Sequence, residues 1–476
     1  MAMNDNGSRQ SAIGQIQAYF ESGGFIEDLA SLVAVETESQ RMEARGSLYH
    51  YLDSHIAQKL YALGFQSEIF DNPVATAGPL LIGERIEDER LPTVLIYGHG
   101  DVVVGQETNW NDGLSPWQVT VKDGRIYGRG TADNKGQHLI AIEALRTVIA
   151  QRGRLGFNCR VLIEMSEEIG SPGLQDFCRS YSDRLRGDVL IASDGPRLVQ
   201  DQAAVVLGSR GSIRFNLTIE ARDGARHSGN WGGLLADPAQ LLVHALATIT
   251  DRRGQIKVPE WRPTPPSESI RELIQACTGP EVLDPNAIDA NWGEEALSPG
   301  ERLLGWNSFA VLALELGDPA RPVNAIQPKA RACCQLRFIK GTDSEDILPA
   351  LRRHLAAEGF DMVKVELDRL TYTNATRLDA SNDWARWAIA SVEETTGTRP
   401  HIVPNLGGTI PNHIFADDLG LATIWLPHSY AGCRQHAPNE HLLETVALEG
   451  LKIMTGMFWD LGDKGQRDAG ASGVKR

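Results

Sequence analysis

The sequence predicts an α/β protein with a doubly wound, mainly parallel sheet and a smaller α+β domain inserted into it. In the first half of the chain, short apolar runs alternate with longer segments that have apolar residues at helical spacing. This is typical of parallel strands buried between helices. From about residue 205 onward, apolar and polar residues alternate, which is typical of antiparallel strands with one exposed face.

The first half supplies most of the predicted sheet. Residues 11–35 have helical spacing, and residues 92–98 form an apolar run of the length of a buried strand. We expect an amphipathic helix over residues 134–153 and two more buried strands at 158–166 and 187–195. Because side chains after such strands gather at one edge of a doubly wound sheet, we expect the chemistry of the protein there.

The second half supplies the predicted insertion and the return to the sheet. An alternating strand and a helix precede a Pro-rich, polar stretch at 254–305, which we expect to be irregular. The other expected elements are strands at 203–221, 330–339, 361–370 and 420–427 and helices at 237–250, 344–359 and 382–397. The insertion thus has a ferredoxin-like order of elements. The predicted domains are a catalytic domain in two parts, 1–207 and 373–476, and an inserted dimerisation or lid domain, 208–372, and we expect the tail, 463–476, to be disordered.

Composition excludes several classes of protein. The chain has 476 residues and a net charge of −16, which argues against a nucleic-acid partner. Its six cysteines form no Cys-x-x-Cys pair, and we interpret them as reduced thiols of a cytoplasmic protein. The first residues lack the pattern of a signal peptide, and no apolar run approaches the ~20 residues that cross a bilayer, so we expect no membrane partner.

Acidic side chains and histidines follow several of the predicted strands. Each signal is weak alone, because such residues also cap turns or lie on surfaces. Carboxylates that converge on one buried edge would repel one another, and a pair of divalent cations removes that problem. Three carboxylates and a bridging hydroxide balance two Zn²⁺ ions, and two imidazoles complete the coordination. The residues of this set are His99, Asp133, Glu168, Asp194 and His436.

Asp101 has two possible roles at this edge. It lies two residues after His99, so its carboxylate could accept the N–H of the imidazole and fix the tautomer that binds metal. Alternatively, Asp101 could simply cap a turn. We favour the first role.

Six motifs in order resemble those of the two-zinc peptidases, a family that includes the aminoacylases, carboxypeptidase G, succinyl-diaminopimelate desuccinylase and the carnosinase-type dipeptidases. The motifs are "GHGDVV", "GRGTADNKG", "EEIGSPG", "SDG", "HSGNWGG" and "HAPNE". They extend from His99 to Glu440. Asp194, where aminoacylases usually have Glu, and the "GGTIP" loop resemble the dipeptidase branch most, whereas "GHGDVVVGQ" and "AGCRQ" depart from the usual family pattern.

The resemblance implies a role for each residue of the metal site. His99 and Asp194 would bind one zinc, Glu168 and His436 the other, and Asp133 both, with a cis peptide bond between Asp133 and Asn134. Mn²⁺ or Co²⁺ could replace zinc. Glu167 would be the general base that takes a proton from the hydroxide-forming water. Glu440 would hold the loop that carries His436, and His428 would line the pocket or simply be buried.

The resemblance also implies roles for residues of the insertion. The sequence alone would place His227 in a turn among glycines, but in the family the corresponding histidine stabilises the oxyanion in the active site of a partner subunit, which implies a homodimer. Arg337 matches an arginine that grips the substrate carboxylate, a task that suits its bidentate fork. Asn324 matches a neighbouring polar position, and Gly407, Gly408 and Thr409 match a loop that contacts the same carboxylate. Each could instead be structural.

These observations predict a metal-dependent hydrolase that cleaves an amide or peptide bond in a small peptide or peptide-like substrate with a free carboxylate. An N-acyl or N-carbamoyl amino acid amidohydrolase is the alternative within the same chemistry. A metal-binding protein without catalysis is the alternative from another class, and the presence of Glu167 beside the predicted ligands argues against it.

Overall fold

The computed structural model describes residues 7–279, 282–283 and 288–473. The chain divides into two compact units, one made of residues 1–208, 378–403 and 411–476 and the other of residues 209–377 and 404–410. We call these unit 1 and unit 2. The domain limits predicted from the sequence place residues 404–410 in the catalytic domain and not in the insertion.

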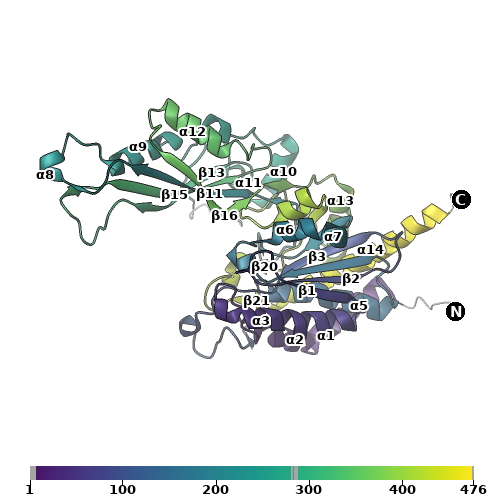
Figure 1. Cartoon of the computed structure of the whole chain (residues 1–476). Helices are drawn as coiled ribbons and strands as arrows, with labels where there is room; N and C mark the ends of the chain where they lie inside the picture. The colour runs from purple at the N-terminus through teal and green to yellow at the C-terminus, as the bar shows by residue number, and fades with distance from the viewer. Residues whose placement is uncertain (1–6, 280–281, 284–287, 474–476) are drawn as a thin grey trace. The chain divides into compact units, whose positions relative to one another are not determined.

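Unit 1 is built around an eight-stranded sheet, visible in Figure 1. Its neighbouring strands β6, β3, β7 and β19 are parallel, and antiparallel strands β1 and β2 extend the sheet beyond β6. The fold class is confirmed. In spatial order the strands are β1 (Gln66–Phe70), β2 (Leu80–Arg85), β6 (Asn158–Glu164), β3 (Thr93–His99), β7 (Val189–Ala192), β19 (Ala422–Trp425), β9 (Ala204–Val206) and β18 (His401–Val403).

Helices cover the sheet of unit 1 (Figure 1). The stretch of helical spacing at residues 11–35 forms two helices, because Gly23 between them adopts a φ of 88° that ends the first. The helices are α1 (Arg9–Glu21), α2 (Gly24–Val33), α3 (Arg45–His50), α4 (Gln58–Ala62), α5 (Lys135–Arg152), α6 (Leu174–Ser180), α7 (Ser182–Leu185), α13 (Asp383–Thr396) and α14 (Glu444–Gly473).

Short elements complete unit 1. They include β4 (Thr120–Lys122), β5 (Arg125–Tyr127), β8 (Pro196–Arg197), β20 (Ser429–Tyr430) and β21 (His441–Leu443) and the single helical turns η1 (Met42–Ala44), η3 (Glu107–Asn109), η4 (Glu167–Ile169) and η8 (Ala431–Cys433). The π-helical segments are η2 (Tyr51–Ala57) and η7 (Ile414–Asp418). No helix among the described residues is long and apolar enough to cross a membrane.

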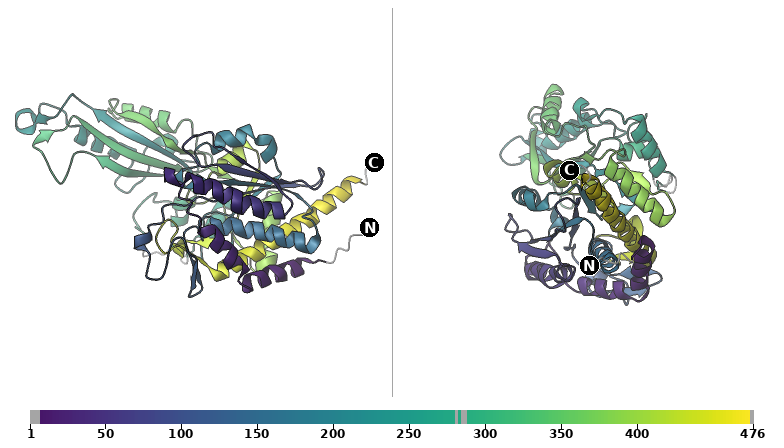
Figure 2. Two further views of the ribbon diagram at one scale, coloured as in Figure 1. Left: turned by 60° about the horizontal axis from the view of Figure 1, so that its bottom comes forward. Right: turned by 90° about the vertical axis from the view of Figure 1, so that its right-hand side faces the viewer.

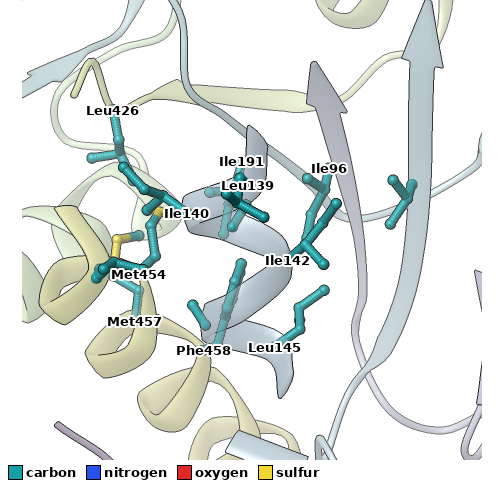
Figure 3. Packing of buried hydrophobic residues seen from close by; sticks show 14 of the residues in the cluster. Ile96, Leu139, Ile140, Ile142, Leu145, Ile191, Leu426, Met454, Met457 and Phe458 are labelled. Carbon is teal, nitrogen blue, oxygen red and sulfur yellow. The ribbon is translucent and has the colours of Figure 1, made fainter. Parts of the chain in front are cut away.

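Helix α5 corrects the expectation of an amphipathic helix. Every residue from Lys135 to Leu145 is buried, including the polar ones. Figure 3 shows Ile140 of α5 next to Met454 of α14, while Leu139 lies near Ile191 of β7. Helix α14 therefore covers a face that would otherwise meet water. It also corrects the expectation for the tail, because it continues to Gly473 (Figure 2), while residues 474–476 lie outside the described residues.

Unit 2 contains a four-stranded antiparallel sheet with its own apolar core. In spatial order the strands are β13 (Ser308–Glu315), β15 (Lys329–Phe338), β11 (Gly211–Glu220) and β16 (Lys364–Thr373). Helices α9 (Pro238–Ile249) and α12 (Ile347–Ala357) pack against this sheet. Strand β13 was not expected, because its side chains are mostly exposed and show no alternation of apolar and polar residues.

The stretch at 254–305 is not irregular throughout, in contrast to the expectation. It contains η5 (Pro259–Trp261), α10 (Glu268–Cys277) and α11 (Pro299–Leu304), and Ser298 and Glu301 form a capping box at the start of α11. Residues 280–281 and 284–287 of the stretch lie outside the described residues. The remaining short elements are β10 (Gly208–Ser209), β12 (Arg226–His227), α8 (Ser228–Trp231), β14 (Ala325–Ile326) and β17 (Thr376–Arg377).

Candidate metal centre

The predicted metal ligands of unit 1 lie at one edge of its sheet. His99 ends β3, Glu168 lies in η4 directly after β6, and Asp194 follows β7. These three strands are parallel neighbours, so their carboxyl ends coincide. Asp133 comes from the loop before α5, and His436 from the segment between η8 and β21.

These five side chains form two groups that share Asp133. In each group, the potential ligand atoms lie within 4.8 Å of one another. In the first group, His99 Nε2 lies 3.2 Å from Asp133 Oδ1 and 3.9 Å from Asp194 Oδ2. In the second group, His436 Nε2 lies 3.1 Å from Asp133 Oδ2 and 3.0 Å from Glu168 Oε2. The two oxygens of Asp133 therefore face different imidazoles, as a carboxylate that bridges two cations would.

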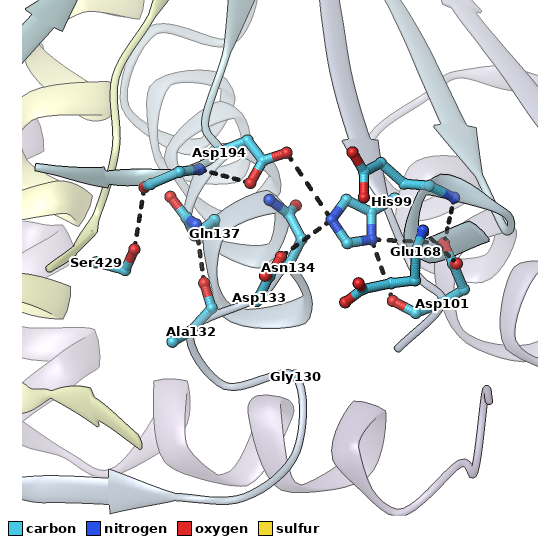
Figure 4. Close-up of polar contacts among 12 residues, drawn as sticks. His99, Asp101, Gly130, Ala132, Asp133, Asn134, Gln137, Glu168, Asp194 and Ser429 are labelled. Atoms are coloured by element: carbon cyan, nitrogen blue, oxygen red, sulfur yellow. Dashed lines mark hydrogen bonds and ion pairs between the residues drawn. The ribbon is translucent and has the colours of Figure 1, made fainter. Parts of the chain in front are cut away.

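The environment of His99 differs from the expectation for Asp101 (Figure 4). His99 Nδ1 lies 3.1 Å from the backbone carbonyl oxygen of Asp101 and 3.4 Å from its carboxylate. The carboxylate accepts hydrogen bonds from the backbone N–H groups of Glu167 and Glu168, each 3.1 Å long. Asp101 thus caps the turn of Glu167 and Glu168 through its carboxylate, and it contacts the imidazole of His99 chiefly through its backbone carbonyl.

Glu440 holds the loop that carries Asp133. Its Oε1 atom accepts hydrogen bonds from the backbone N–H groups of Gly130, Ala132 and Asp133, at 3.0, 3.1 and 3.0 Å. Its Oε2 atom lies 2.7 Å from Arg129 Nη1 in a fully buried ion pair. Glu440 lies four residues after His436, so it connects the segments that present both residues. From the sequence, we expected Glu440 to hold only the loop that carries His436.

The segment after Asp133 is fixed by further buried contacts. The peptide bond between Asp133 and Asn134 is cis, as expected. Asn134 Nδ2 donates to the carbonyl oxygen of Ser193, next to Asp194, at 2.7 Å. Gln137 Nε2 donates to the carbonyl oxygen of Ala132 at 2.8 Å (Figure 4). These positioning residues were not predicted, although Asn134 and Gln137 belong to the "GRGTADNKG" motif and its continuation.

The electrostatics of the site indicate a strong need for positive charge. Burial and the charge of Asp133 raise the pKa of Glu168 to about 7 and the pKa of Asp194 to about 6. Hydrogen bonds to Asp133 and Glu168 raise the pKa of His436 to about 11. Burial opposes ionisation of Asp133, but hydrogen bonds from His436 and His99 outweigh it and lower the pKa of Asp133. Protonated imidazoles thus compensate for the clustered carboxylates here.

Glu167 lies beside the two groups without belonging to either of them. Burial, opposed in part by the charge of His99, raises the pKa of Glu167 well above its usual value, and the charges of Asp194 and Glu168 raise it further. A raised pKa strengthens the affinity of this carboxylate for a proton, which is the direction that a general base requires.

The donor set fits two divalent cations. It consists of imidazole nitrogens and carboxylate oxygens, which are ligands that Zn²⁺, Mn²⁺ and Co²⁺ accept. Burial, and after it the charge of Asp133, raises the pKa values of Glu168 and Asp194, and both effects favour a cation among these carboxylates. His428 contributes to neither group: it is buried, and burial together with the charge of Arg197 lowers its pKa to about 3.

The other predicted site residues belong to unit 2. His227 is exposed on β12, where its Nδ1 atom accepts a hydrogen bond from Gly229 N–H at 3.1 Å. Asn324, also exposed, accepts a hydrogen bond through its backbone oxygen from Ser228 N–H at 2.9 Å, so Asn324 and His227 lie close together. Arg337 Nη1 donates to Thr409 Oγ1 at 2.8 Å, which joins two of the residues predicted to bind the substrate carboxylate.

Gly407 and Gly408 differ in the space around them. A Cβ atom on Gly407 would lie 3.3 Å from a side-chain atom of Leu303, whereas one on Gly408 would meet nothing within 4 Å. The backbone at Gly408 is therefore open on that side, as a loop that offers N–H groups to a ligand would be.

Two sequence relatives of this chain are named as dipeptidases. A Beta-Ala-His dipeptidase of Rattus norvegicus is 33% identical over 470 residues, which cover 92% of each chain. A Cys-Gly metallodipeptidase of Schizosaccharomyces pombe is 26% identical over 440 residues, which cover 87% of this chain and 85% of the relative.

Solved structures show the same fold. Human carnosine dipeptidase 1 matches with a TM-score of 0.76 and 23% identity over 95% of this chain and 99% of that chain. The dipeptidase Dug1p of Saccharomyces cerevisiae matches with a TM-score of 0.77 and 21% identity over 97% of this chain and 99% of that chain. Residues 95–460, which span all of the candidate ligands, match the description "Peptidase family M20/M25/M40". With this match and a relative that is 33% identical over nearly its whole length, the chain belongs to that peptidase family.

Proposed function

We propose that this chain is a two-metal dipeptidase, and that His99 and Asp194 hold one cation, Glu168 and His436 hold the other, and Asp133 binds both. The observation that carries the proposal is the pair of ligand groups joined through the two oxygens of Asp133. The named dipeptidases that this chain resembles over most of its length support the choice of substrate.

Zinc suits this ligand set best among the divalent cations, and Mn²⁺ and Co²⁺ are the alternatives. Two bound cations would supply Lewis acidity and make a water molecule acidic enough to give up a proton near neutral pH. Glu167 would accept that proton as the water attacks the amide carbon and then deliver it to the leaving nitrogen. Asp101 serves this step by fixing the backbone of Glu167 and the ring of His99 together.

The residues of unit 2 would bind and polarise the substrate. Arg337 would grip the free carboxylate together with Thr409 and the backbone of Gly407 and Gly408, and Asn324 would contact the substrate nearby. His227 would donate a hydrogen bond to the developing oxyanion, and its exposed imidazole is free for such a role. These assignments rest on the family resemblance and on the contact between Arg337 and Thr409.

A homodimer in the cytoplasm is part of the proposal. Strand β13 is an edge of the sheet of unit 2, and its exposed side chains include Val311, Leu312 and Leu314, which are 41, 49 and 50% exposed. An exposed apolar edge strand is a favourable surface for pairing with a second copy of a chain. In such a dimer, His227 would act in the active site of the partner.

The test combines metal content with substrate preference. Purified protein is stripped by a chelator and reloaded with zinc, manganese or cobalt, and hydrolysis is measured on dipeptides, N-acyl amino acids and N-carbamoyl amino acids. We expect two cations per chain and the highest kcat/KM on a dipeptide. A higher kcat/KM on N-acyl or N-carbamoyl amino acids would favour the amidohydrolase, and two bound cations without turnover of any substrate would favour a binding protein.

A further inference from the structure

Three arginines surround the loop of residues 404–410 in unit 2, and the proposed function uses only one of them. Arg337 donates to Thr409 of this loop at 2.8 Å. Arg377 donates through Nε and Nη2 to Asn405 Oδ1, at 3.3 and 2.7 Å. The backbone N–H of Arg210 donates to the carbonyl oxygen of Leu406 at 3.2 Å. The loop is therefore joined to all three residues.

The side chain of Arg210 lies close to that of Arg337. Arg210 Nη2 contacts Ser308 Oγ, and Ser308 lies directly opposite Arg337 in the pairing of β13 with β15. Arg210 is only 3% exposed, and its Nε atom has no hydrogen-bond partner. Burial together with the charge of Arg337 lowers the pKa of Arg210 to about 10, so both guanidinium groups remain charged at neutral pH.

These arginines lack acidic partners. Within the described part of the chain, none of the three forms an ion pair with a carboxylate, and each donates to neutral oxygens of a carbonyl, a hydroxyl or an amide. Arg214, on the same strand β11, shows the contrast, because its Nε atom lies 2.7 Å from Asp368 Oδ2. In a chain with a net charge of −16, three partly or wholly buried cations without counter-charges form a local excess of positive charge.

A substrate with one carboxylate would neutralise only part of this excess. Burying unpaired charges is unfavourable, so an anion that brings a second negative charge to the loop gains more from the same three arginines. A cavity of about 390 Å³, lined by Arg210 and Ser308 among others and also by the acidic residues Asp289 and Glu294, offers space beside Arg210 for a side chain of the ligand. This volume lies within the range of small-molecule sites.

We propose that Arg210 and Arg377, together with Arg337, make this chain select dipeptides whose C-terminal residue is aspartate or glutamate. The C-terminal carboxylate binds at Arg337 and Thr409, and the side-chain carboxylate is attracted by the positive charge of the other two arginines. This inference rests on the proposed dipeptidase function and concerns only the choice among its substrates.

The experiment compares substrates of equal shape and different charge. We would measure kcat/KM of the zinc-loaded enzyme for Gly-Glu against Gly-Gln and for Ala-Asp against Ala-Asn. We expect the acidic member of each pair to be favoured at least about tenfold at low salt, and less at high salt because ions screen the attraction. Equal or faster cleavage of Gly-Gln and Ala-Asn would overturn the inference and leave the dipeptidase function intact. No cleavage of any dipeptide would overturn both.

Variants separate charge from structure. Arg377→Gln should lower the preference for Gly-Glu over Gly-Gln at least about threefold, and Arg377→Lys, which keeps the charge, should restore most of it. Arg214→Gln is the matched control, because Arg214 already has Asp368 as its partner, and it should leave the preference unchanged. If Arg377→Gln kept the full preference, or if Arg214→Gln lowered it equally, the selection would not come from these arginines. Because the ratio compares two substrates on one enzyme preparation, partial unfolding of a variant does not change it.

Discussion

The candidate site residues of unit 1 and those of unit 2 are held in different ways. In unit 1, the side chains of His99, Asp133 and Glu168 are deeply buried, and charged contacts or hydrogen bonds connect each of them to another site residue. Another predicted ligand, His436, is exposed but contacts Asp133 and Glu168 in the same way. In unit 2, His227 and Asn324 are exposed. The difference indicates that unit 1 is organised around cations, whereas these residues of unit 2 have surfaces that remain available to a substrate or a partner subunit.

The pKa shifts follow the same division. Carboxyl groups in unit 1 have raised pKa values because they are buried beside other carboxylates. In unit 2, the pKa values of Arg210 and Arg337 are lowered because burial disfavours their positive charge. The metal site of unit 1 therefore favours additional positive charge, and the three arginines of unit 2 favour additional negative charge. Metal ions would supply the positive charge in unit 1, and an anionic substrate would supply the negative charge in unit 2.

The largest expected effect comes from Glu167 in unit 1. Replacing Glu167 with Gln should lower kcat about 10³-fold, in the middle of the range for general acid–base catalysis, because the amide cannot accept the proton. Metal content should stay at two per chain, since Glu167 belongs to neither ligand group. Elemental analysis and steady-state kinetics on the same sample check both. Exposed Glu89→Gln serves as the control, and more than a tenth of the activity left in Glu167→Gln would disprove the assignment.

His227 tests whether unit 2 contributes to catalysis without contributing to stability. Replacing it with Ala should lower kcat about 10²-fold, as the loss of an oxyanion donor does. The urea midpoint should not change, because the side chain is exposed and makes one local hydrogen bond. Activity and unfolding curves of the two proteins check this prediction. A shifted midpoint would instead indicate a structural role.

Mixing variants shows in which subunit His227 acts. In a dimer of one His227→Ala chain and one Glu167→Gln chain, a histidine that acts on the partner restores one complete site. Random exchange should then recover up to about a quarter of wild-type activity, because half of the dimers are mixed and each has one such site. Each variant incubated alone is the control. No recovery, despite exchange shown by mass-tagged chains, would place His227 in its own subunit's site.

Arg337 should have a smaller effect, and on substrate binding. Replacing it with Met should raise KM for a dipeptide about 10- to 100-fold, which corresponds to the loss of a charged hydrogen bond. The preference for the dipeptide over its C-terminal amide should fall as well. Arg331, which is exposed on the same strand, gives the matched control Arg331→Met. Unchanged discrimination against the amide in Arg337→Met would remove Arg337 from the carboxylate site.

Metal binding in unit 1 should also depend on pH. Glu168, with a pKa of about 7, and Asp194, with a pKa of about 6, must be ionised to bind a cation, and His436 must lose a proton. Protons therefore compete with metal, and affinity should fall as pH decreases from about 7.5 to about 5.5, by at least about tenfold per pH unit. Chelator competition across this range measures it. An affinity independent of pH would contradict the ligand set.

Stability of the metal-free protein should change with pH in the same region. When burial raises the pKa of a carboxyl group, the folded state favours its protonated form over its ionised form more strongly than the unfolded state does. Its contribution is therefore present below the usual pKa of about 4.3 for Glu and is lost as pH rises through the folded value of about 7 for Glu168. Through Glu168, the metal-free protein should have a lower free energy of unfolding at pH 8 than at pH 5.5. Bound cations should abolish that difference.

Local patterns in the sequence predicted much of the fold and the order of the candidate site. The apolar run of β3 and those of β6 and β7 indicate buried parallel strands, and residues just after such strands must meet at one edge. His99, Glu168 and Asp194 could therefore be placed together before any coordinates were known. Helix spacing likewise gave α5, α9, α12 and α13.

Contacts between distant segments could not be predicted in this way. Glu440 binds the backbone around Asp133 across more than 300 residues of chain, and α14 buries a face of α5 that the sequence suggested would be exposed. The lack of carboxylate partners at Arg210, Arg337 and Arg377 is likewise a property of the packed unit. The sequence by itself determined which residue types follow each strand, because periodicity is local. Only the tertiary structure decided which buried charges are compensated, because that depends on what packing brings within a few ångströms.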